Sequence, residues 1–400
     1  MVLNKNLIKN VSLLGIVRFF NLAFPILIVP QVINLIDIDG YGQFVFFQSI
    51  IVLLSSIYVF GANTKGIDYL TKINNNFHKK YLSDFLSTQF LLYIILLLLS
   101  ILVMFLFDFK QNWKPFLFLF IANSCRITFT EFYYIVKNKL TVPVYLNFVF
   151  RFSILIGLYS LPDFFSNITN ITLLYMISSL LPGVFNLFLL KINFFFKFHD
   201  IKKILFENLK FVHARIVISI KDKLGQILLG MFYGMEITAI YDIGIKIINV
   251  GAIPTSILSQ YFLVLKNKIK IKDLLIYLRI NLVISILSCL PLFIFSDYIA
   301  EILNLSNKTF TNLSICSSLG IVFISASSTL GNNGLIKLKK DSSYLVSVYF
   351  TTFFYIISFF LFLNFSSNTL NKSIIILPAV ATYLFEILVR LYFLKFFFKK

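Results

Sequence analysis

Nine basic residues lie inside long apolar stretches of this sequence, where a charge is costly. They are Arg18, Arg126, Arg151, Arg215, Lys221, Lys223, Lys246, Arg279 and Arg390. A charge at the centre of a bilayer costs about 2.5–3.5 kcal/mol on insertion scales, so it usually faces a protein interior or an aqueous cavity. Arginine also forms bidentate hydrogen bonds with phosphate. The pattern predicts one kind of chemistry, the binding of an anionic group inside a membrane.

The cations that lie deepest are the candidate substrate-binding residues. They are Arg18, Arg126, Arg151, Lys221, Lys223 and Lys246. The deep acids are fewer, namely Glu131, Asp222 and Asp242. Ion pairing with these acids is the structural alternative, but the excess of cations favours a hydrated cavity in which an anionic substrate supplies the missing counter-charge. Glu131 and Asp222 are hypothesised to couple transport to H⁺ or Na⁺; a role in packing alone is the alternative for both.

The other three cations lie near the predicted cytoplasmic ends of their helices. Arg215 and Arg279 are within a turn or two of such an end, and Arg390 follows Glu386 by one helical turn. Long basic side chains at these positions reach toward the interface, and opposite charges four residues apart on a helix pair. We expect all three arginines to reach the membrane surface, with Arg390 paired to Glu386.

The elements that position these residues follow from composition. The 400 residues are 58% hydrophobic and only 13% charged. Runs of about 18 or more apolar residues are typical of membrane helices, and they are too long for the alternating strands of a barrel. We predict an all-α membrane protein with about twelve spans. They are residues 11–36, 43–61, 85–107, 115–136, 142–161, 171–190, 212–233, 239–265, 274–296, 311–335, 342–364 and 373–394.

The lysines outside these runs predict the orientation in the membrane. All but Lys110, Lys114, Lys308 and Lys372 fall at the termini or in the loops after even-numbered runs. The positive-inside rule then places both termini in the cytoplasm. The net charge of +19 is explained by this asymmetry and by attraction to anionic lipid, so no nucleic acid partner is predicted. The loops are too short for a soluble catalytic domain, which argues against an enzyme.

An even count of spans allows two halves of the same orientation. We predict a six-helix bundle over residues 1–196, a cytoplasmic amphipathic linker over 197–211 and a second six-helix bundle over 212–400. A pseudo-two-fold axis along the membrane normal would relate the bundles, as in some transporters. A weak repeat supports this, since Asp39–Phe44 and Glu236–Tyr241 occupy equivalent places in the two halves.

Other reactive residue types give no site. The three cysteines are isolated and form no CxxC pair, and the three histidines are scattered, so neither a metal site nor a cofactor is predicted. The first apolar run is too long for the core of a signal peptide, and we expect no cleavage after it. Pro25 and Pro30 are expected to interrupt the first span, Pro254, close to Gly251, the eighth, and Pro378 lies in the twelfth, because proline removes a backbone hydrogen bond and kinks a helix. Such breaks could be hinges or packing kinks.

Several segments together resemble a known family. The segments Pro25–Pro30, Asp39–Phe44, Gln48–Ile50 and Phe60–Asn63 are similar to the N-terminal signature of bacterial polysaccharide flippases, the O-antigen and capsule repeat-unit transporters of the multidrug/oligosaccharidyl-lipid/polysaccharide superfamily. The region from Asp222 to Tyr241 resembles the span 7–8 region of that family. The run Glu131–Ile135 departs from the family pattern.

The resemblance implies a function as well as a fold. It implies two six-helix bundles around a V-shaped cavity, and alternating access that moves an undecaprenyl-diphosphate-linked oligosaccharide out of the cytoplasmic leaflet of the bacterial inner membrane. The implied partners are that lipid-linked substrate, membrane lipid, a coupling H⁺ or Na⁺ and a polysaccharide polymerase. Head-group contacts would come from the deep cations. Three alternatives stay open: an ion-coupled multidrug exporter, a membrane-embedded polymerase or glycosyltransferase, and a purely structural membrane subunit.

Overall fold

The computed structural model describes residues 5–59, 66–106, 113–137, 139, 141–192, 194, 198–265, 271–338, 340–365 and 374–398, with side chains from Phe24 onward. Every regular element in these ranges is a helix, which confirms the predicted all-helical class. The helices are α1 (Lys5–Tyr58), α2 (Ile67–Lys72), η2 (Asn75–Phe77), α3 (His78–Leu106), α4 (Trp113–Ala122), α5 (Cys125–Thr128), α6 (Glu131–Val136), α7 (Thr141–Ser160), α8 (Ile168–Leu190), α9 (Phe198–Phe232), α10 (Met235–Gly251), α11 (Ile253–Leu265), α12 (Ile271–Ile294), α13 (Ser296–Ile302), α14 (Asn307–Ser328), the π-helix η4 (Thr329–Ile336), α15 (Asp341–Phe365) and α16 (Leu377–Phe398).

Among the described residues, eight helices are long and apolar enough to cross a membrane, and nine if the bent pair α10 and α11 forms one span. The chain is therefore a multi-pass membrane protein. The label α1 covers two helices that meet at a kink, where Ile36 and Asp37 have non-helical backbone angles, so the break lies where the first predicted span ends. The predicted span 115–136 is divided into α4, α5 and α6, and α9 carries charges within the predicted span 212–233. The count of twelve and the arrangement in two six-helix bundles stay predictions.

Two helix breaks have different local causes. α10 and α11 meet at a bend of 43°. Pro254 is the second residue of α11, so the bend lies where the sequence predicts an interruption. The kink in α1 falls instead at Ile36 and Asp37, while Pro25 and Pro30 lie inside the helix, so the interruption predicted at these two prolines is wrong. With a φ of 60° and a ψ of 173°, Asp37 has a strained backbone that residues other than glycine rarely adopt.

The chain forms two compact units, which we call unit 1 (Met1–Phe20 and Leu35–Ile227) and unit 2 (Asn21–Asn34 and Leu228–Lys400). The helix α9 runs without a break through the predicted linker and the predicted seventh span. The predicted bundle boundaries at 196 and 212 stay predictions.

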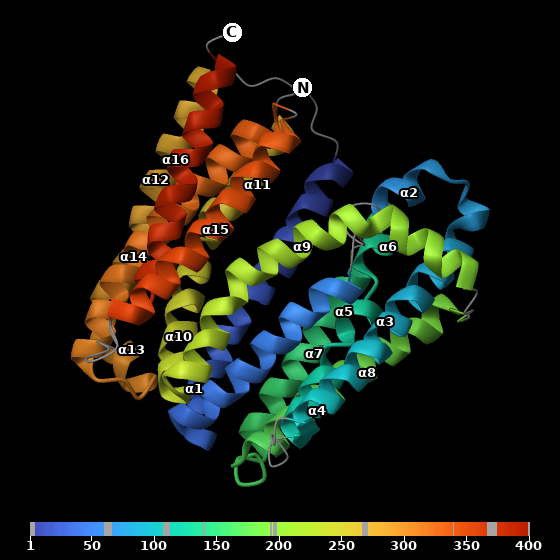
Figure 1. The fold of residues 1–400 in the computed structure, drawn as a ribbon, viewed down its shortest axis with the longest axis horizontal. Coiled ribbons are helices and arrows are strands. Elements are labelled where there is room, and N and C mark those ends of the chain that lie inside the picture. Colours follow the sequence, from blue (N-terminus) through green and yellow to red (C-terminus); the bar gives the residue numbers. More distant parts are fainter. Residues whose placement is uncertain are drawn as a thin grey trace. The chain divides into compact units, whose positions relative to one another are not determined.

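In unit 1, α8 packs along α4 and α7, and also contacts α5 (Figure 1). Aromatic side chains connect α1, α3 and α4 in the same unit. The rings of Phe47 and Phe116 meet edge to face at 5.9 Å between centroids, and Tyr93 lies 5.4 Å from Tyr58 and 5.2 Å from Phe120. Such edge-to-face pairs stabilise helix contacts beyond the area that they bury.

In unit 2, α14 packs against α10, α12 and α16, and α15 packs against α16 (Figure 1). Glycines allow α10 and α14 to approach closely. A Cβ added at Gly251 would lie 2.3 Å from Ile321 Cδ1, and one added at Gly320 would lie 2.5 Å from Ile248 Cδ1. Small residues at contact points are typical of helix packing in membranes, where van der Waals contact drives association.

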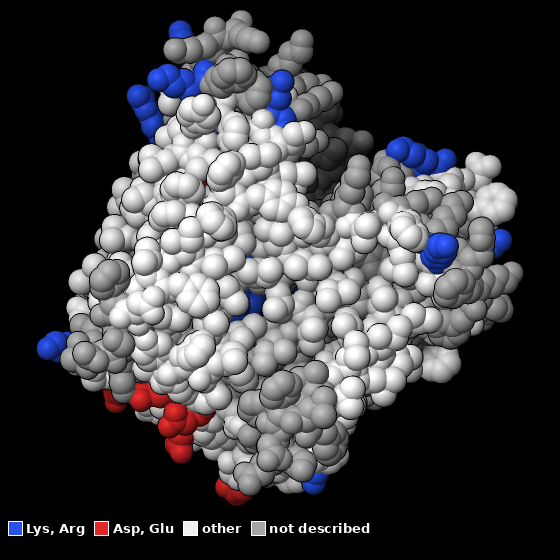
Figure 2. All heavy atoms as spheres, in the orientation of Figure 1, with Lys and Arg blue, Asp and Glu red and all other residues white. Residues whose placement is uncertain are grey.

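Charges gather at opposite ends of the helices of unit 2. Lys272, Lys340 and Lys395 are exposed at the end that contains the start of α12 and the end of α16. Asp297 and Glu301 are exposed on α13, at the other end. Figure 2 shows most of the basic side chains of this unit near the C-terminus and the acidic ones near α13; Lys308, exposed at the start of α14, is an exception. The side chains between the two ends are mostly apolar, as a helical membrane unit requires.

Candidate functional site

Two breaks divide the predicted fourth span of unit 1 into three short helices that carry charged side chains. α4 ends at Ala122, α5 covers only Cys125–Thr128, and α6 begins at Glu131. The amide of Asn123 in the first break donates to the Ile51 carbonyl of α1 at 3.3 Å. Polar side chains that satisfy freed backbone groups make such breaks tolerable in a membrane. As a result, Arg126 and Glu131 stand on separate short helices.

Arg151 lies beside both pieces of this broken span. The residue is on α7, is half-buried, and lies within electrostatic range of Glu131 and Cys125. Cys125 is in turn close to Arg126 and Arg151. One turn before Arg151, the Asn147 amide donates to Glu131 Oε1 at 3.3 Å and to the Pro143 carbonyl at 2.9 Å. Asn147 thereby ties the Glu131 carboxylate of α6 to α7, the helix that carries Arg151.

The helix α9 adds a third arginine. Arg215 is exposed and lies within electrostatic range of Arg126 on α5 and of Asp222 two turns later on α9. We call Arg126, Arg151, Arg215, Glu131 and Asp222 the arginine cluster. It holds three cations against two carboxylates, so it carries a net positive charge. Arg126, Arg215 and Asp222 are exposed. The free-energy cost of these charges is lower in a hydrated environment than in hydrocarbon.

Lys223 is fixed next to this cluster on the same helix. Its Nζ donates to Gln226 Oε1 at 2.9 Å, and the hydroxyl of Ser49 on α1 donates to the same oxygen at 2.6 Å. Both Gln226 and Ser49 are almost fully buried. This contact connects α9 to α1 within unit 1 and limits where the half-buried Lys223 ammonium can move. Lys221 is half-buried on the same helix.

The predicted site residues therefore separate into groups. Unit 1 brings together Arg126, Arg151, Glu131 and Asp222, with Lys223 close in sequence to Asp222. Lys246 lies in unit 2, where its Nζ is 2.6 Å from Asp242 Oδ2. Arg18 lies in α1, but its side chain is outside the described residues. The substrate-binding and ion-coupling roles of these residues stay predictions.

Sequence reasoning missed several members of the site. We expected Arg215 to reach the membrane surface, which stays a prediction; the sequence did not show that its exposed side chain also lies in electrostatic range of Arg126. One signal was available, since Arg215 and Asp222 are two helical turns apart and so share a face of α9. No comparable signal existed for Asn147, Gln226 or Ser49, whose contacts depend on how separate helices pack.

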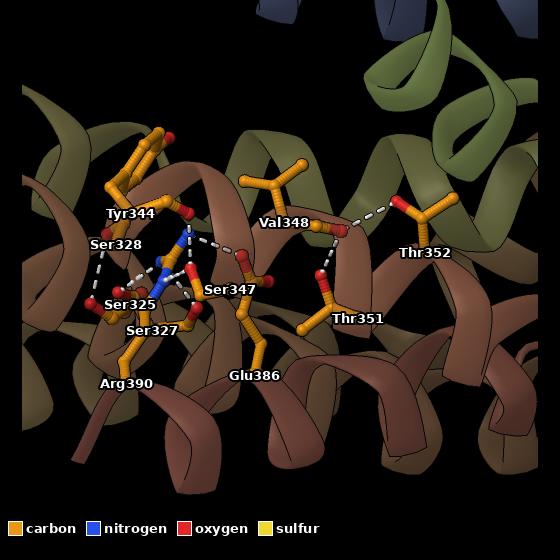
Figure 3. A network of polar contacts seen from close by, with 10 residues as sticks. All are labelled: Ser325, Ser327, Ser328, Tyr344, Ser347, Val348, Thr351, Thr352, Glu386 and Arg390. Carbon is orange, nitrogen blue, oxygen red and sulfur yellow. Dashed lines mark hydrogen bonds and ion pairs between the residues drawn. The ribbon is translucent and has the colours of Figure 1, made fainter. Parts of the chain in front are cut away.

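Unit 2 contains a charged network of a different kind (Figure 3). Arg390 on α16 is 4% exposed, and its Nη2 is 2.5 Å from Glu386 Oε1. Its Nη1 donates to the carbonyl oxygen of Ser327 at 2.6 Å and to the hydroxyl at 2.8 Å, and the guanidinium lies over the ring of Tyr344 at 5.1 Å. The predicted Glu386–Arg390 pair is confirmed. The expectation that Arg390 reaches the membrane surface is wrong, because protein groups on α14 and α15 surround it.

A metal centre is not evident within the described ranges. No group of three or more His, Cys, Asp or Glu side chains there could hold a metal ion. The cysteines are unpaired thiols, with Cys125 half-buried and Cys289 and Cys316 buried. The guanidinium groups of the arginine cluster can recognise a group that bears negative oxygens by hydrogen bonds and charge.

Comparisons with known proteins identify a family and a shared fold. A family model described as "Polysaccharide biosynthesis protein" matches residues 7–265, more than half of the chain. A structure of the lipid II flippase MurJ in an inward closed conformation matches with a TM-score of 0.70 and 15% identity, over 94% of this chain and 87% of the other. The curated proteins contain no match.

Two multidrug transporters also share the fold. An inward-facing multidrug resistance MATE family transporter of the MOP superfamily has a TM-score of 0.65 and 13% identity, over 96% of this chain and 94% of the other. An outward-facing structure of such a transporter has a TM-score of 0.57 and 12% identity, over 97% and 94%. At these identities the similarity establishes the fold and nothing finer.

Proposed function

The chain belongs to the polysaccharide biosynthesis protein family, and we propose that it is a flippase rather than an enzyme. Its proposed substrate is an undecaprenyl-diphosphate-linked oligosaccharide, the repeat unit of an O-antigen or capsule, which it carries across the bacterial cytoplasmic membrane by alternating access. The observation that carries the proposal is the arginine cluster of unit 1, where membrane-embedded cations outnumber carboxylates.

A diphosphate headgroup fits the chemistry of this cluster. The headgroup brings several anionic oxygens, and each arginine offers a planar set of donors that matches two of them. Carrying such a group through hydrocarbon without cations would cost many kcal/mol, since even one charge is expensive there. Arg126 and Arg151 are proposed as direct contacts, supported by Arg215 and by the anchored Lys223. Arg18, Lys221 and Lys246 are proposed as further cations met along the path.

The two carboxylates of the cluster suggest how transport is coupled to an ion. Glu131 lies in range of Arg151, and Asp222 in range of Arg215. A bound diphosphate would compete with both carboxylates for the same guanidinium groups. A carboxylate displaced in this way takes up a proton or a cation more readily, which would link substrate binding to H⁺ or Na⁺ movement.

The charge asymmetry supports the proposed orientation. The lysine-bearing end of unit 2 includes the end of α16, and acidic side chains occupy the other end. By the positive-inside rule, the lysine end faces the cytoplasm, where repeat units are assembled. A polysaccharide polymerase on the outer side is then the proposed next partner of the substrate.

An exporter of cationic drugs is the alternative within the same superfamily. Recognition of a cation requires carboxylates or aromatic faces in excess. The cluster has the opposite balance, with three arginines against two carboxylates.

The proposal is tested by deletion and complementation in a polysaccharide-producing host. Deletion should remove surface polysaccharide and accumulate undecaprenyl-linked repeat units on the cytoplasmic face. The wild-type gene should restore export, whereas Arg151→Ala and Lys223→Ala should not, at equal amounts of protein in the membrane. Lys272→Ala, at an exposed lysine of α12 outside the cluster, is the matched control and should restore export. Normal surface polysaccharide in the deletion strain would overturn the assignment.

A further inference from the structure

The second break of the fourth span is held without proline or glycine. It falls between α5 and α6, at Phe129 and Thr130, and Thr130 has a φ of 45°. This left-handed conformation is strained for a β-branched residue. A residue is kept in such a conformation only where its surroundings fix it. A neighbouring helix must therefore supply the restraint.

The side chain of Asn186 on α8 supplies three contacts at this break. Its Nδ2 donates to the Thr128 carbonyl at 2.6 Å and to the Thr130 hydroxyl at 3.1 Å. Its Oδ1 accepts from the Tyr134 hydroxyl at 2.5 Å. The contacts reach α5, the break and α6, so one side chain connects all three. Asn186 is fully buried, where each hydrogen bond is strong and its loss is costly.

The backbone of α8 comes unusually close to the same point. Gly183 is one turn before Asn186, and a Cβ added there would lie 2.4 Å from Thr128 Oγ1. Gly183 thus brings α8 near enough for the short Asn186 side chain to reach into the break. Glycine and asparagine together form a docking point for the broken span.

This docking point determines where the charges of the cluster stand. Arg126 lies on α5 just before the break, and Glu131 is the first residue of α6 just after it. In an intact helix the spacing of Arg126 and Glu131 would be fixed by helix geometry. The break allows α5 and α6 to take different directions. The position of Arg126 relative to Glu131 is then set by the contacts of Asn186.

We infer that Asn186 is a positioning residue of the headgroup site, which fixes Arg126 by holding the break between α5 and α6. The inference rests on the proposed function, because it assigns Arg126 to an anionic headgroup. Asn186 touches no ligand itself in this scheme. Its effect on binding passes through Arg126.

The test uses the full-length protein in detergent micelles and two readouts. The first is the affinity for farnesyl diphosphate, a short isoprenyl diphosphate, measured by calorimetry on folded protein. The second is the labelling rate of Cys125, next to Arg126, by a charged thiosulfonate reagent after Cys289→Ser and Cys316→Ser remove the other thiols. Labelling reports the geometry of α5 whether or not the ligand binds.

Asn186→Leu should change the Cys125 labelling rate several-fold and lower the affinity about tenfold, the size expected when one charge-assisted hydrogen bond is lost. In an Arg126→Gln background the same substitution should lower the affinity by no more than about twofold, because coupled residues are not additive. Tyr134→Phe, which removes one contact and keeps the packing, should give a smaller change in the same direction. It also covers the case in which Asn186→Leu fails to fold.

The matched control is Asn281→Leu. Asn281 is equally buried, but in unit 2, and its Nδ2 donates to Thr329 Oγ1 at 2.6 Å. This variant should leave both readouts unchanged in folded protein. Unchanged Cys125 labelling in Asn186→Leu and Tyr134→Phe, or an equal loss of affinity in Asn281→Leu, would overturn the inference. So would a full loss of affinity from Asn186→Leu in the Arg126→Gln background.

A wild-type protein that does not bind farnesyl diphosphate would count instead against the proposed function. The labelling rates would then still decide whether Asn186 fixes α5, so the two failures are distinguishable.

Discussion

Arg390 in unit 2 and Arg126 in unit 1 are the same residue type in membrane-embedded helices, yet their surroundings are opposite. Arg390 is 4% exposed and is surrounded by Glu386, Ser327 and the ring of Tyr344. Arg126 is exposed and lies in range of a second cation, Arg215. Its side chain forms no ion pair with the carboxylates of the described residues.

The difference separates two uses of a membrane arginine. A guanidinium whose charge and donors are fully met by protein groups stabilises the packing of helices and leaves nothing for a ligand. A guanidinium placed beside another cation raises the free energy of the empty protein and lowers it again when an anion binds. Burial and local charge balance therefore distinguish a structural arginine from one that binds a ligand. The position of the residue within its apolar stretch does not.

The largest effect is expected from removing the carboxylate of the buried pair. Glu386→Ala leaves the Arg390 charge buried without its ion-pair partner, which costs about 3–5 kcal/mol. The loss is measured by unfolding the protein in detergent with heat or denaturant. Glu301→Ala, at an exposed carboxylate on α13, is the control and should change stability by no more than about 0.5 kcal/mol. Equal stability of the two variants would mean that the Arg390 network is not structural.

The reverse pattern is expected for Arg126. Arg126→Gln removes an exposed charge, so the free energy of unfolding should change by no more than about 0.5 kcal/mol. Its affinity for farnesyl diphosphate should fall by about 1.5–3 kcal/mol, the range for hydrogen bonds to charged groups, which is a loss of tenfold or more. Calorimetry on the wild type and the variant measures both the free energy of unfolding and the affinity for farnesyl diphosphate. A large loss of stability with intact binding would remove the distinction between the two arginines.

Glycines beside the two regions sharpen the comparison. A Cβ at Gly331 in the π-helix would lie 2.6 Å from Arg390 Nη1, and one at Gly183 would lie 2.4 Å from Thr128 Oγ1. Overpacking should cost each Ala variant about 1–3 kcal/mol of stability. Only Gly183→Ala should also weaken farnesyl diphosphate binding, because only it adjoins the break that carries Arg126. Gly334→Ala, which meets the flexible end of Leu394 at 3.1 Å, is the milder control.

The smallest effect is expected at Ser49, which holds Gln226 and through it Lys223. Ser49→Ala removes the hydroxyl that contacts Gln226 Oε1 and the Val45 carbonyl; the loss of the Gln226 contact, worth about 0.5–1.5 kcal/mol, should weaken binding of farnesyl diphosphate only a few-fold. Ser56→Ala on the same helix removes a bond to the Leu53 carbonyl alone, so its binding should match wild type. Equal affinities of the two variants for farnesyl diphosphate would mean that the contact of Ser49 with Gln226 and Lys223 has no effect on binding.

Features that depend on composition or on spacing within one helix could be predicted from the sequence. The helical class, the membrane location and the Glu386–Arg390 pair belong here, since the pair needs only a spacing of four residues. The bend beside Pro254 also followed from a local rule. The resemblance of the segments near Pro25 and Asp39 correctly indicated the family.

Features that depend on packing between distant segments could not be predicted. The break at Thr130 contains no proline or glycine, and its restraint comes from Asn186 on another helix. The burial of Arg390 requires the Ser327 carbonyl and the space left by Gly331, neither of which its own helix reveals. The distance of Arg215 from the end of its helix can be read from the sequence. Its electrostatic interaction with Arg126 on another helix cannot.

The most direct measurement is transport by purified protein in liposomes, using a fluorescent undecaprenyl-diphosphate-linked sugar whose outer-leaflet population is quenched by dithionite. Wild-type protein should make the inner-leaflet label accessible, as should Arg279→Gln at an exposed arginine of α12 outside the cluster. The double variant Arg126→Gln, Arg151→Gln should be folded and inactive. Transport by the double variant at the wild-type rate would contradict the assignment of the headgroup to the arginine cluster.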